Sequence, residues 1–173
     1  RALLSVSLLS TLVLATVVAV ADEGGAPVLV TPAPAELGEL EFGPDGVLFA
    51  GDSRDGVVYA LEVPAGEPAA GEFTAVEDLD GKIAGMLGVS PRDIRVGDLA
   101  VHPESGETWL SIMREGGGAS TPALFRVTPA GEIHHVPFEG MRYTQLSLTD
   151  APADDPEARR NPRSSTITDL ELI

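Results

Sequence analysis

An internal repeat limits the possible fold of this chain more than any other feature of its sequence. The stretch 39–63, ELEFGPDGVLFAGDSRDGVVYALEV, returns in altered form at 98–127 as DLAVHPESGETWLSIMREGGGASTPALFRV. Both copies begin with an acidic residue and a leucine, reach a proline five positions later, and carry an aromatic residue at equivalent positions, Phe49 and Trp109. A third copy begins at 169–172, where DLEL resembles the opening of the first. Self-similarity at a period of tens of residues indicates a repeat protein.

Each copy has the pattern of several short β-strands joined by tight turns. Apolar residues alternate with others in runs such as 57–61, and the PDG sequence at 44–46 is typical of a turn. A fourth run closes each copy, at 72–76 (EFTAV) and at 132–136 (EIHHV). Four antiparallel strands per repeat are typical of a propeller blade. We therefore predict an all-β fold, namely a β-propeller fragment of about two four-stranded blades, the start of a third and a short helical insertion.

Blade length sets how much of a propeller the chain can form. Such blades take about 40 to 45 residues, and at least about four are needed to close a ring, so we expect the chain to be a fragment. The alternative is a small sandwich of two blades packed face to face. The predicted boundaries are a first blade at about 38–77, a helical insertion at 78–95, a second blade at about 96–138, a loop at 139–165 and the start of a third blade at 166–173. Within that loop, 143–148 is a further candidate strand.

The helical insertion is predicted from the spacing of its apolar residues. Ile83, Met86 and Leu87 fall on one side of a helix, which Asp80 can cap at its start and Gly88 can end. Such a helix either covers strands or forms part of a lid over one end of a channel. We favour the covering role, because loops of this size are functional only in some proteins.

The N-terminal segment carries the features of an export signal. Residues 1–21 have a positive start, an apolar middle and an A-x-A end at 19–21, which predicts a signal peptide cleaved before Asp22 and a secreted or periplasmic protein. An uncleaved membrane anchor is the alternative. Residues 22–37, rich in Gly, Pro and Ala, are predicted to be a linker, although VLV at 28–30 can also act as a strand that closes the ring.

Composition excludes several functional classes. The chain has no cysteine, which excludes disulfides, c-type haem attachment and cysteine-based zinc sites. Its formal net charge of -16 argues against nucleic acid as a partner and, after signal cleavage, against a membrane surface. No nucleophile elbow, zinc-protease motif or phosphate-binding loop is present. The partners that remain are a protein, a glycan or a small molecule, and we assign no catalytic residue and no organic cofactor.

Three acidic residues, Glu39, Asp98 and Asp169, lead the three copies of the repeat. The first strand of a propeller blade lines the central channel, so these carboxylates are expected to converge there. Carboxylate oxygens bind hard cations, and a bound cation can activate water. The three residues are therefore a candidate site for Ca²⁺ or another divalent cation. The alternative, which we favour, is that each acid accepts hydrogen bonds from backbone N–H groups at a strand start or faces water.

An arginine cluster is the only concentrated positive charge in this acidic chain. It consists of Arg159, Arg160 and Arg163, and such a group can hold an anion. The alternative, which we favour, is that these arginines form surface ion pairs with neighbouring carboxylates. Those carboxylates are Asp154, Asp155 and Glu157.

The two repeat copies resemble a known group of propellers. LEFGPDGVLFAGDSRDGVVYAL and LAVHPESGETWLSI resemble blades of secreted bacterial six- or seven-bladed propellers of the NHL, strictosidine synthase, SMP-30/gluconolactonase and YVTN-repeat types, and of uncharacterised exported propeller proteins. The resemblance covers about 38–138 and the last few residues, and it implies a fold more than a function. In the lactonase branch, Glu, Asn and Asp side chains hold a divalent cation on the channel axis. Glu39 matches the glutamate, but the only asparagine, Asn161, lies in a predicted loop.

Two functions follow from these observations. The first, which we favour, is a non-catalytic binding or scaffold module. The alternative is a divalent-metal-dependent hydrolase of the lactonase type with a carboxylate-lined central channel.

Overall fold

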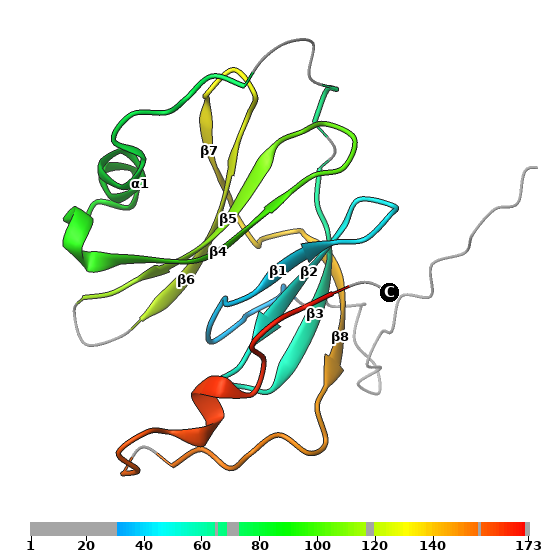
Figure 1. The fold of residues 1–173 in the computed structure, drawn as a ribbon, viewed down its shortest axis with the longest axis vertical. Helices are drawn as coiled ribbons and strands as arrows, with labels where there is room; N and C mark the ends of the chain where they lie inside the picture. Colours follow the sequence, from blue (N-terminus) through cyan, green and yellow to red (C-terminus); the bar gives the residue numbers. More distant parts are fainter. Residues whose placement is uncertain (1–30, 65, 69–72, 117–119, 156, 172–173) are drawn as a thin grey trace, which may run out of the picture. The chain divides into compact units, whose positions relative to one another are not determined.

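A computed structural model describes the chain from residue 31 to residue 171, apart from residues 65, 69–72, 117–119 and 156. This part of the chain folds mostly as β structure, in two four-stranded antiparallel sheets with one α-helix and two short 3-10 helices (Figure 1). The predicted signal peptide and the linker as far as residue 30 lie outside it. Within these bounds, no helix has the length and hydropathy needed to cross a membrane.

Sheet A contains the first copy of the repeat. Its strands are β1 (Leu40–Phe42), β2 (Val47–Asp52), β3 (Val57–Glu62) and β8 (Arg142–Ser147), in the spatial order β1-β2-β3-β8. The predicted PDG turn joins β1 to β2, and its glycine, Gly46, has a φ of 73°, a conformation that glycine adopts without steric cost.

Sheet B contains the second copy. Its strands are β4 (Ile94–Val101), β5 (Thr108–Arg114), β6 (Thr121–Val127) and β7 (Ile133–Val136), and they pair in sequence order. The predicted fourth run of this copy is confirmed, because it forms β7.

The two sheets correspond residue by residue. Leu40 pairs with Ala50 in sheet A as Leu99 pairs with Leu110 in sheet B. The same registers place Phe49 and Trp109 at equivalent positions, as the repeat predicted.

The fourth strand of the first copy was predicted wrongly. Residues 73–76 form no strand, and β8, from the predicted loop, pairs with β3 in their place. The segment that follows β3 leaves sheet A, since the backbone N–H of Thr74 donates to the carbonyl of Pro129 beside sheet B at 2.8 Å and Val76 packs into the core of that sheet. All of sheet B therefore lies, in sequence, between the third and fourth strands of sheet A.

Two hydrophobic clusters form the core of the protein. Both sheets belong to one compact unit that begins at Thr31. The first cluster joins the facing sides of the sheets, and the second lies on the opposite side of sheet B. The first contains Phe42, Leu48, Tyr59 and Leu61 of sheet A with Ala100, Trp109, Leu124 and Val136 of sheet B. The Phe42 and Trp109 rings meet edge to face at a centroid distance of 6.1 Å.

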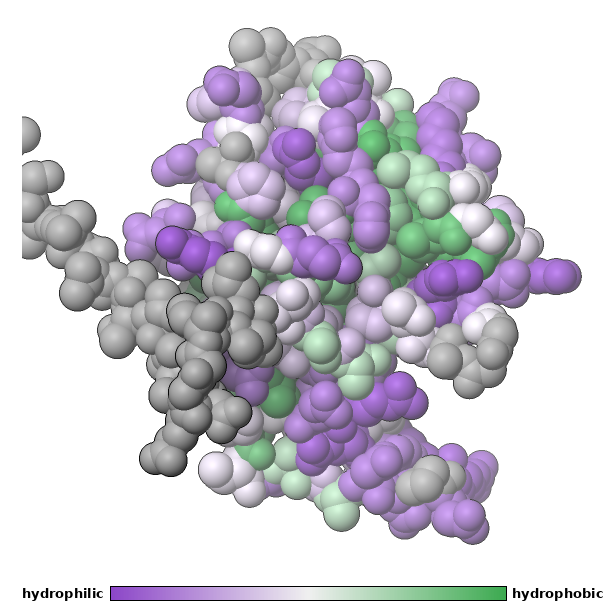
Figure 2. All heavy atoms as spheres, turned by 180° about the vertical axis from the view of Figure 1, so that it is seen from behind, coloured by the Kyte–Doolittle hydropathy of each residue, from purple (hydrophilic) through white to green (hydrophobic). Residues whose placement is uncertain are grey.

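The helix α1 (Leu79–Leu87) covers the second cluster of sheet B. Ile83 is fully buried against Ile112 and Phe125, which confirms the covering role expected of the insertion. Met86 points away and is 51% exposed. The helix starts slightly earlier than predicted, with Asp78 as N-cap, and Gly88 ends it in the left-handed conformation as expected. Figure 2 shows hydrophobic residues gathered over sheet B and α1, whereas the surface around residues 148–166 is hydrophilic.

Two 3-10 helices and the last described residues complete the fold. The 3-10 helices are Pro91–Asp93, which leads into β4, and Pro162–Ser165. The predicted start of a third blade, 166–173, forms no strand as far as residue 171, but Ile167 is buried against sheet A.

Candidate functional site

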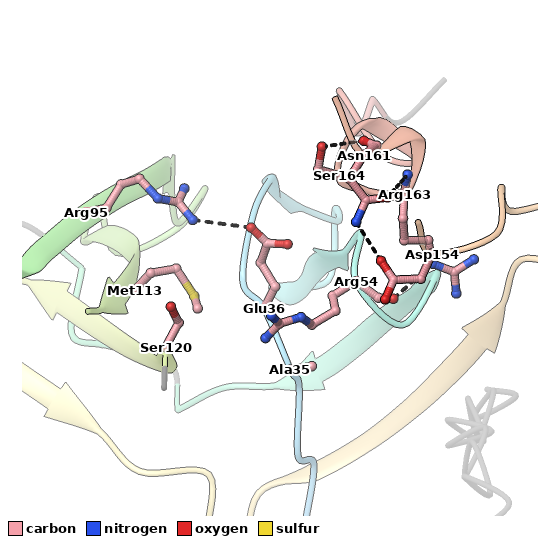
Figure 3. A pocket seen from close by; sticks show the side chains of 10 residues that line it. All are labelled: Ala35, Glu36, Arg54, Arg95, Met113, Ser120, Asp154, Asn161, Arg163 and Ser164. Atoms are coloured by element: carbon pink, nitrogen blue, oxygen red, sulfur yellow. Dashed lines mark hydrogen bonds and ion pairs between the residues drawn. The ribbon is translucent and has the colours of Figure 1, made fainter. Parts of the chain in front are cut away.

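A cleft of about 230 Å³ opens where corresponding ends of the two sheets meet (Figure 3). Each sheet contributes residues at the entry to its first strand and at the connection between its second and third strands. The segment after β8 supplies the remaining wall. The lining residues are Ala35, Glu36, Arg54, Arg95, Met113, Ser120, Asp154, Asn161, Arg163 and Ser164. The cleft is therefore built from loops and strand ends of both repeats.

Arg95 connects the two sheets at the rim of the cleft. Its guanidinium lies 3.2 Å from a carboxylate oxygen of Glu36, before β1, and 3.2 Å from a carboxylate oxygen of Glu115, after β5. All three side chains are partly exposed, so the ion pairs contribute little to stability. Their effect is to fix the charges that a ligand would meet.

Arg163 has a structural role, which corrects the surface ion pair predicted for this member of the arginine cluster. Its guanidinium donates hydrogen bonds to the carbonyls of Arg54, Asp55 and Pro152, at 2.9, 2.8 and 2.7 Å. It thereby fastens the segment after β8 to the β2–β3 turn. Its guanidinium is thus engaged with carbonyls, and it does not form the predicted surface ion pair.

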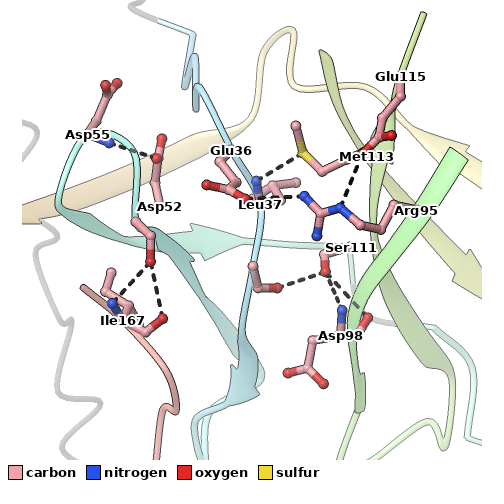
Figure 4. Close-up of polar contacts among 12 residues, drawn as sticks. Glu36, Leu37, Asp52, Asp55, Arg95, Asp98, Ser111, Met113, Glu115 and Ile167 are labelled. Carbon is pink, nitrogen blue, oxygen red and sulfur yellow. Dashed lines mark hydrogen bonds and ion pairs between the residues drawn. The ribbon is translucent and has the colours of Figure 1, made fainter. Parts of the chain in front are cut away.

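Asp98 and Ser111 form a clamp between the sheets, shown in Figure 4. The β4–β5 register shifts between Val96 and Leu99, which leaves one extra residue on β4 opposite Ser111. At this bulge the N–H of Asp98 donates to Oγ of Ser111 at 2.7 Å, and Oγ donates to the carbonyl of Gly38 at 2.7 Å. The carboxylate of Asp98 accepts from the N–H of Leu40 at 2.9 Å, at the start of β1.

The three predicted metal ligands do not form a cluster of ligands in this structure. Asp98 accepts a backbone hydrogen bond at a strand start, the role we favoured for these acids. Glu39 is partly exposed and Asp169 is exposed. Among the residues from 31 to 171 that are described, no three His, Asp or Glu side chains lie close enough together to hold a metal ion. The metal site remains a prediction from sequence.

Sequence reasoning missed the buried residue Asp52 at the end of β2. Its carboxylate accepts from the N–H groups of Ala35 at 2.7 Å and Asp55 at 2.9 Å. Burial raises the pKa of Asp52, and the backbone hydrogen bonds oppose this effect only in part. The only available signal was the polar pair Asp52-Ser53 after an apolar run, which is also the usual composition of a turn.

A buried ion pair, also missed from sequence, joins Glu107 before β5 to Arg126 on β6. The carboxylate of Glu107 is 4% exposed, and its Oε1 contacts the Arg126 guanidinium. Its Oε2 and the indole nitrogen of Trp109 are buried without hydrogen-bond partners among the described residues. Neither residue of this pair lines the cleft.

Comparisons with known proteins add no functional assignment. The chain matches no family model, no curated protein and no solved structure.

Proposed function

We propose that this chain is part of an exported β-propeller that binds or presents a partner without catalysing a reaction. The observation that supports the proposal best is the cleft, which is formed by equivalent ends of two equivalent sheets and is lined by side chains of both charges.

The relation between the sheets supports a propeller arrangement. In both, the first three strands lie side by side in sequence order and a fourth pairs with the third, and a continuous hydrophobic core fills the space between their facing sides. Their first strands, β1 and β4, lie next to each other and are joined by the Asp98–Leu40 hydrogen bond. Blades of a propeller are arranged in this way, with first strands nearest the centre.

The chemistry of the cleft supports binding over catalysis. None of the described residues that line the cleft is a histidine, so neither Ser120 nor Ser164 has the imidazole base of a serine nucleophile beside it there. The hydroxyl of Ser164 donates to the carbonyl of Asn161 at 2.8 Å, which is a structural contact. Arginines and carboxylates close together suit a polar ligand such as a charged peptide segment or a glycan.

A binding screen tests this proposal. The purified chain would be applied to arrays of charged peptides and of oligosaccharides, and every hit would be measured again with Arg54→Ala. We expect affinity to fall by about tenfold or more, as truncation of an arginine at an interface centre does. Arg92→Ala, which removes an exposed arginine outside the cleft, is the matched control and should leave affinity unchanged.

A second arm separates binding from hydrolysis. The same preparation would be assayed on lactones and esters with Ca²⁺, Mn²⁺ or Zn²⁺ added. Turnover that a chelator abolishes and that Glu39→Ala removes would replace the binding proposal with the metal-dependent hydrolase.

A further inference from the structure

One side of sheet A carries apolar residues that no other described sheet covers. The other side packs against sheet B, as described above. Strand alternation and the pairing registers place the apolar residues of this uncovered side next to one another. We call this set of residues the open face. They are Phe49 and Gly51 on β2, Val58 and Ala60 on β3, and Leu146 on β8.

Ile167 packs against the open face. A Cβ on Gly51 would lie 2.9 Å from Cγ2 of Ile167, so the isoleucine occupies the space that the glycine leaves. The backbone of Ile167 is held by Ser53, whose Oγ accepts from its N–H at 3.0 Å and donates to its carbonyl at 3.1 Å. Ile167 is 7% exposed.

A contact at the equivalent positions joins sheet A to sheet B. Leu37, three residues before Leu40, donates its N–H to Sδ of Met113 at 3.4 Å. By the pairing registers, Met113 of sheet B is equivalent to Ser53 of sheet A. Ile167 lies three residues before Leu170, the leucine that opens the third copy of the repeat. The third copy therefore approaches sheet A as the first copy approaches sheet B, and Figure 4 shows both contacts.

Two pairs of equivalent apolar positions differ in whether they are covered. Val136 of sheet B is 7% exposed because sheet A packs on it, whereas its equivalent in sheet A, Leu146, is 65% exposed. Trp109 is fully buried, and its equivalent Phe49 is only partly buried. On the open face Leu146 is exposed and Phe49, Val58 and Ala60 are partly exposed. Apolar residues that reach solvent together on one sheet face mark an interaction surface.

We propose that the open face is the docking surface for a third β-sheet of this same protein, which begins with Ile167 and takes the place relative to sheet A that sheet A takes relative to sheet B. The sheets would then lie in the order B, A, third, and not in the order of the sequence. This proposal rests on the propeller part of the proposed function.

The order follows from the topology already described. Because β8 returns to sheet A after sheet B is complete, the chain leaves the fold from sheet A. The next sheet is thus reached from β8 through residues 148–166, without crossing sheet B. In this arrangement Glu39, the equivalent of Asp98, would accept a hydrogen bond from the N–H of Leu170, as Asp98 does from Leu40.

Thiol labelling tests the proposal, because the chain has no cysteine of its own. The protein would be made from its complete reading frame with Leu146→Cys, and in a second form that ends at Ile173. The control is Met86→Cys, at a residue of comparable exposure on α1. We expect Cys at 146 in the complete protein to react with a maleimide at least about tenfold more slowly than the control, because a covered thiol reacts only after local opening. The form that ends at Ile173 should show equal rates.

Equal labelling rates at the two positions in the complete protein would overturn the proposal. Protection that disappears on dilution would also overturn it, because a second copy of the chain would then be the occupant. Unchanged melting curves of both variants verify that the substitutions leave the fold intact. Labelling does not depend on a ligand in the cleft, so the binding proposal can fail while this one holds, and the reverse.

Discussion

Replacing Ser111 by alanine should destabilise the protein strongly, although it removes a single oxygen atom. The hydroxyl is fully buried, accepts from the N–H of Asp98 and donates to the carbonyl of Gly38. Both backbone groups lie at the junction of the sheets, and the substitution leaves both without this partner. A buried polar group left unpaired costs about 1–3 kcal/mol, and because Gly38 and Asp98 are only partly buried, the two together should lower the free energy of unfolding by about 2–4 kcal/mol, below the full sum.

The effect is large enough to measure by thermal and urea denaturation. At roughly 3 °C per kcal/mol for a domain of this size, Ser111→Ala should lower Tm by roughly 6–12 °C. Ser164→Ala is the matched control, since that hydroxyl donates to the carbonyl of Asn161 in an exposed loop and its loss should cost less than about 0.5 kcal/mol. If Ser111→Ala were no more destabilising than Ser164→Ala, the clamp would not be an energetic link between the sheets.

Three further predictions concern single positions. Gly97→Ala should lower Tm, because the added Cβ would lie 2.9 Å from the carbonyl oxygen of Leu37. Gly85→Ala on α1 is the contrast, because its Cβ meets no atom within 4 Å. It should raise the free energy of unfolding by about 0.5–1 kcal/mol, and Tm with it. Arg126→Met should lower the free energy of unfolding by about 3–5 kcal/mol, because it leaves the buried carboxylate of Glu107 unpaired. In urea denaturation, the double variant that also carries Glu107→Gln should recover most of this loss. The pKa of Asp52 is raised above its ordinary value of 3.8, so the native state binds the proton of this carboxyl group more tightly than the unfolded state does. The free energy of unfolding should therefore fall as pH rises through that raised pKa. Asp52→Asn should remove this part of the pH dependence in a series of melts, and an unchanged pH profile would contradict the assignment.

The repeat allowed most of both sheets to be predicted from sequence. Its strands are short, alternate in polarity and are joined by local turns, so the information that defines β1 to β3 and β4 to β7 lies within each copy. The strand β8 was assigned less well, because pairing with β3 depends on which segment reaches that sheet edge. EFTAV at 72–76 has the better local pattern for a strand, but the chain that carries it turns toward sheet B and α1.

The site was less predictable than the fold for a physical reason. The cleft is lined by residues from loops and strand ends that are far apart in sequence, so no local pattern describes it. Asp98 was identified as a special position, yet its partner Leu40 lies 58 residues away and decides that the carboxylate acts as a backbone acceptor. Similarly, nothing near Arg163 indicated that three carbonyl groups would surround its guanidinium.

The insertion of sheet B between β3 and β8 has a consequence for the folding order. Glu62 and Arg142, which pair across the β3–β8 ladder, are 80 residues apart, and contacts of such long sequence separation slow folding. Until β8 has been synthesised, the edge of β3 is unprotected and can pair with other chains. Sheet B, by contrast, contains only neighbours in sequence, so we expect its amides to gain protection from hydrogen exchange during refolding before those of β3.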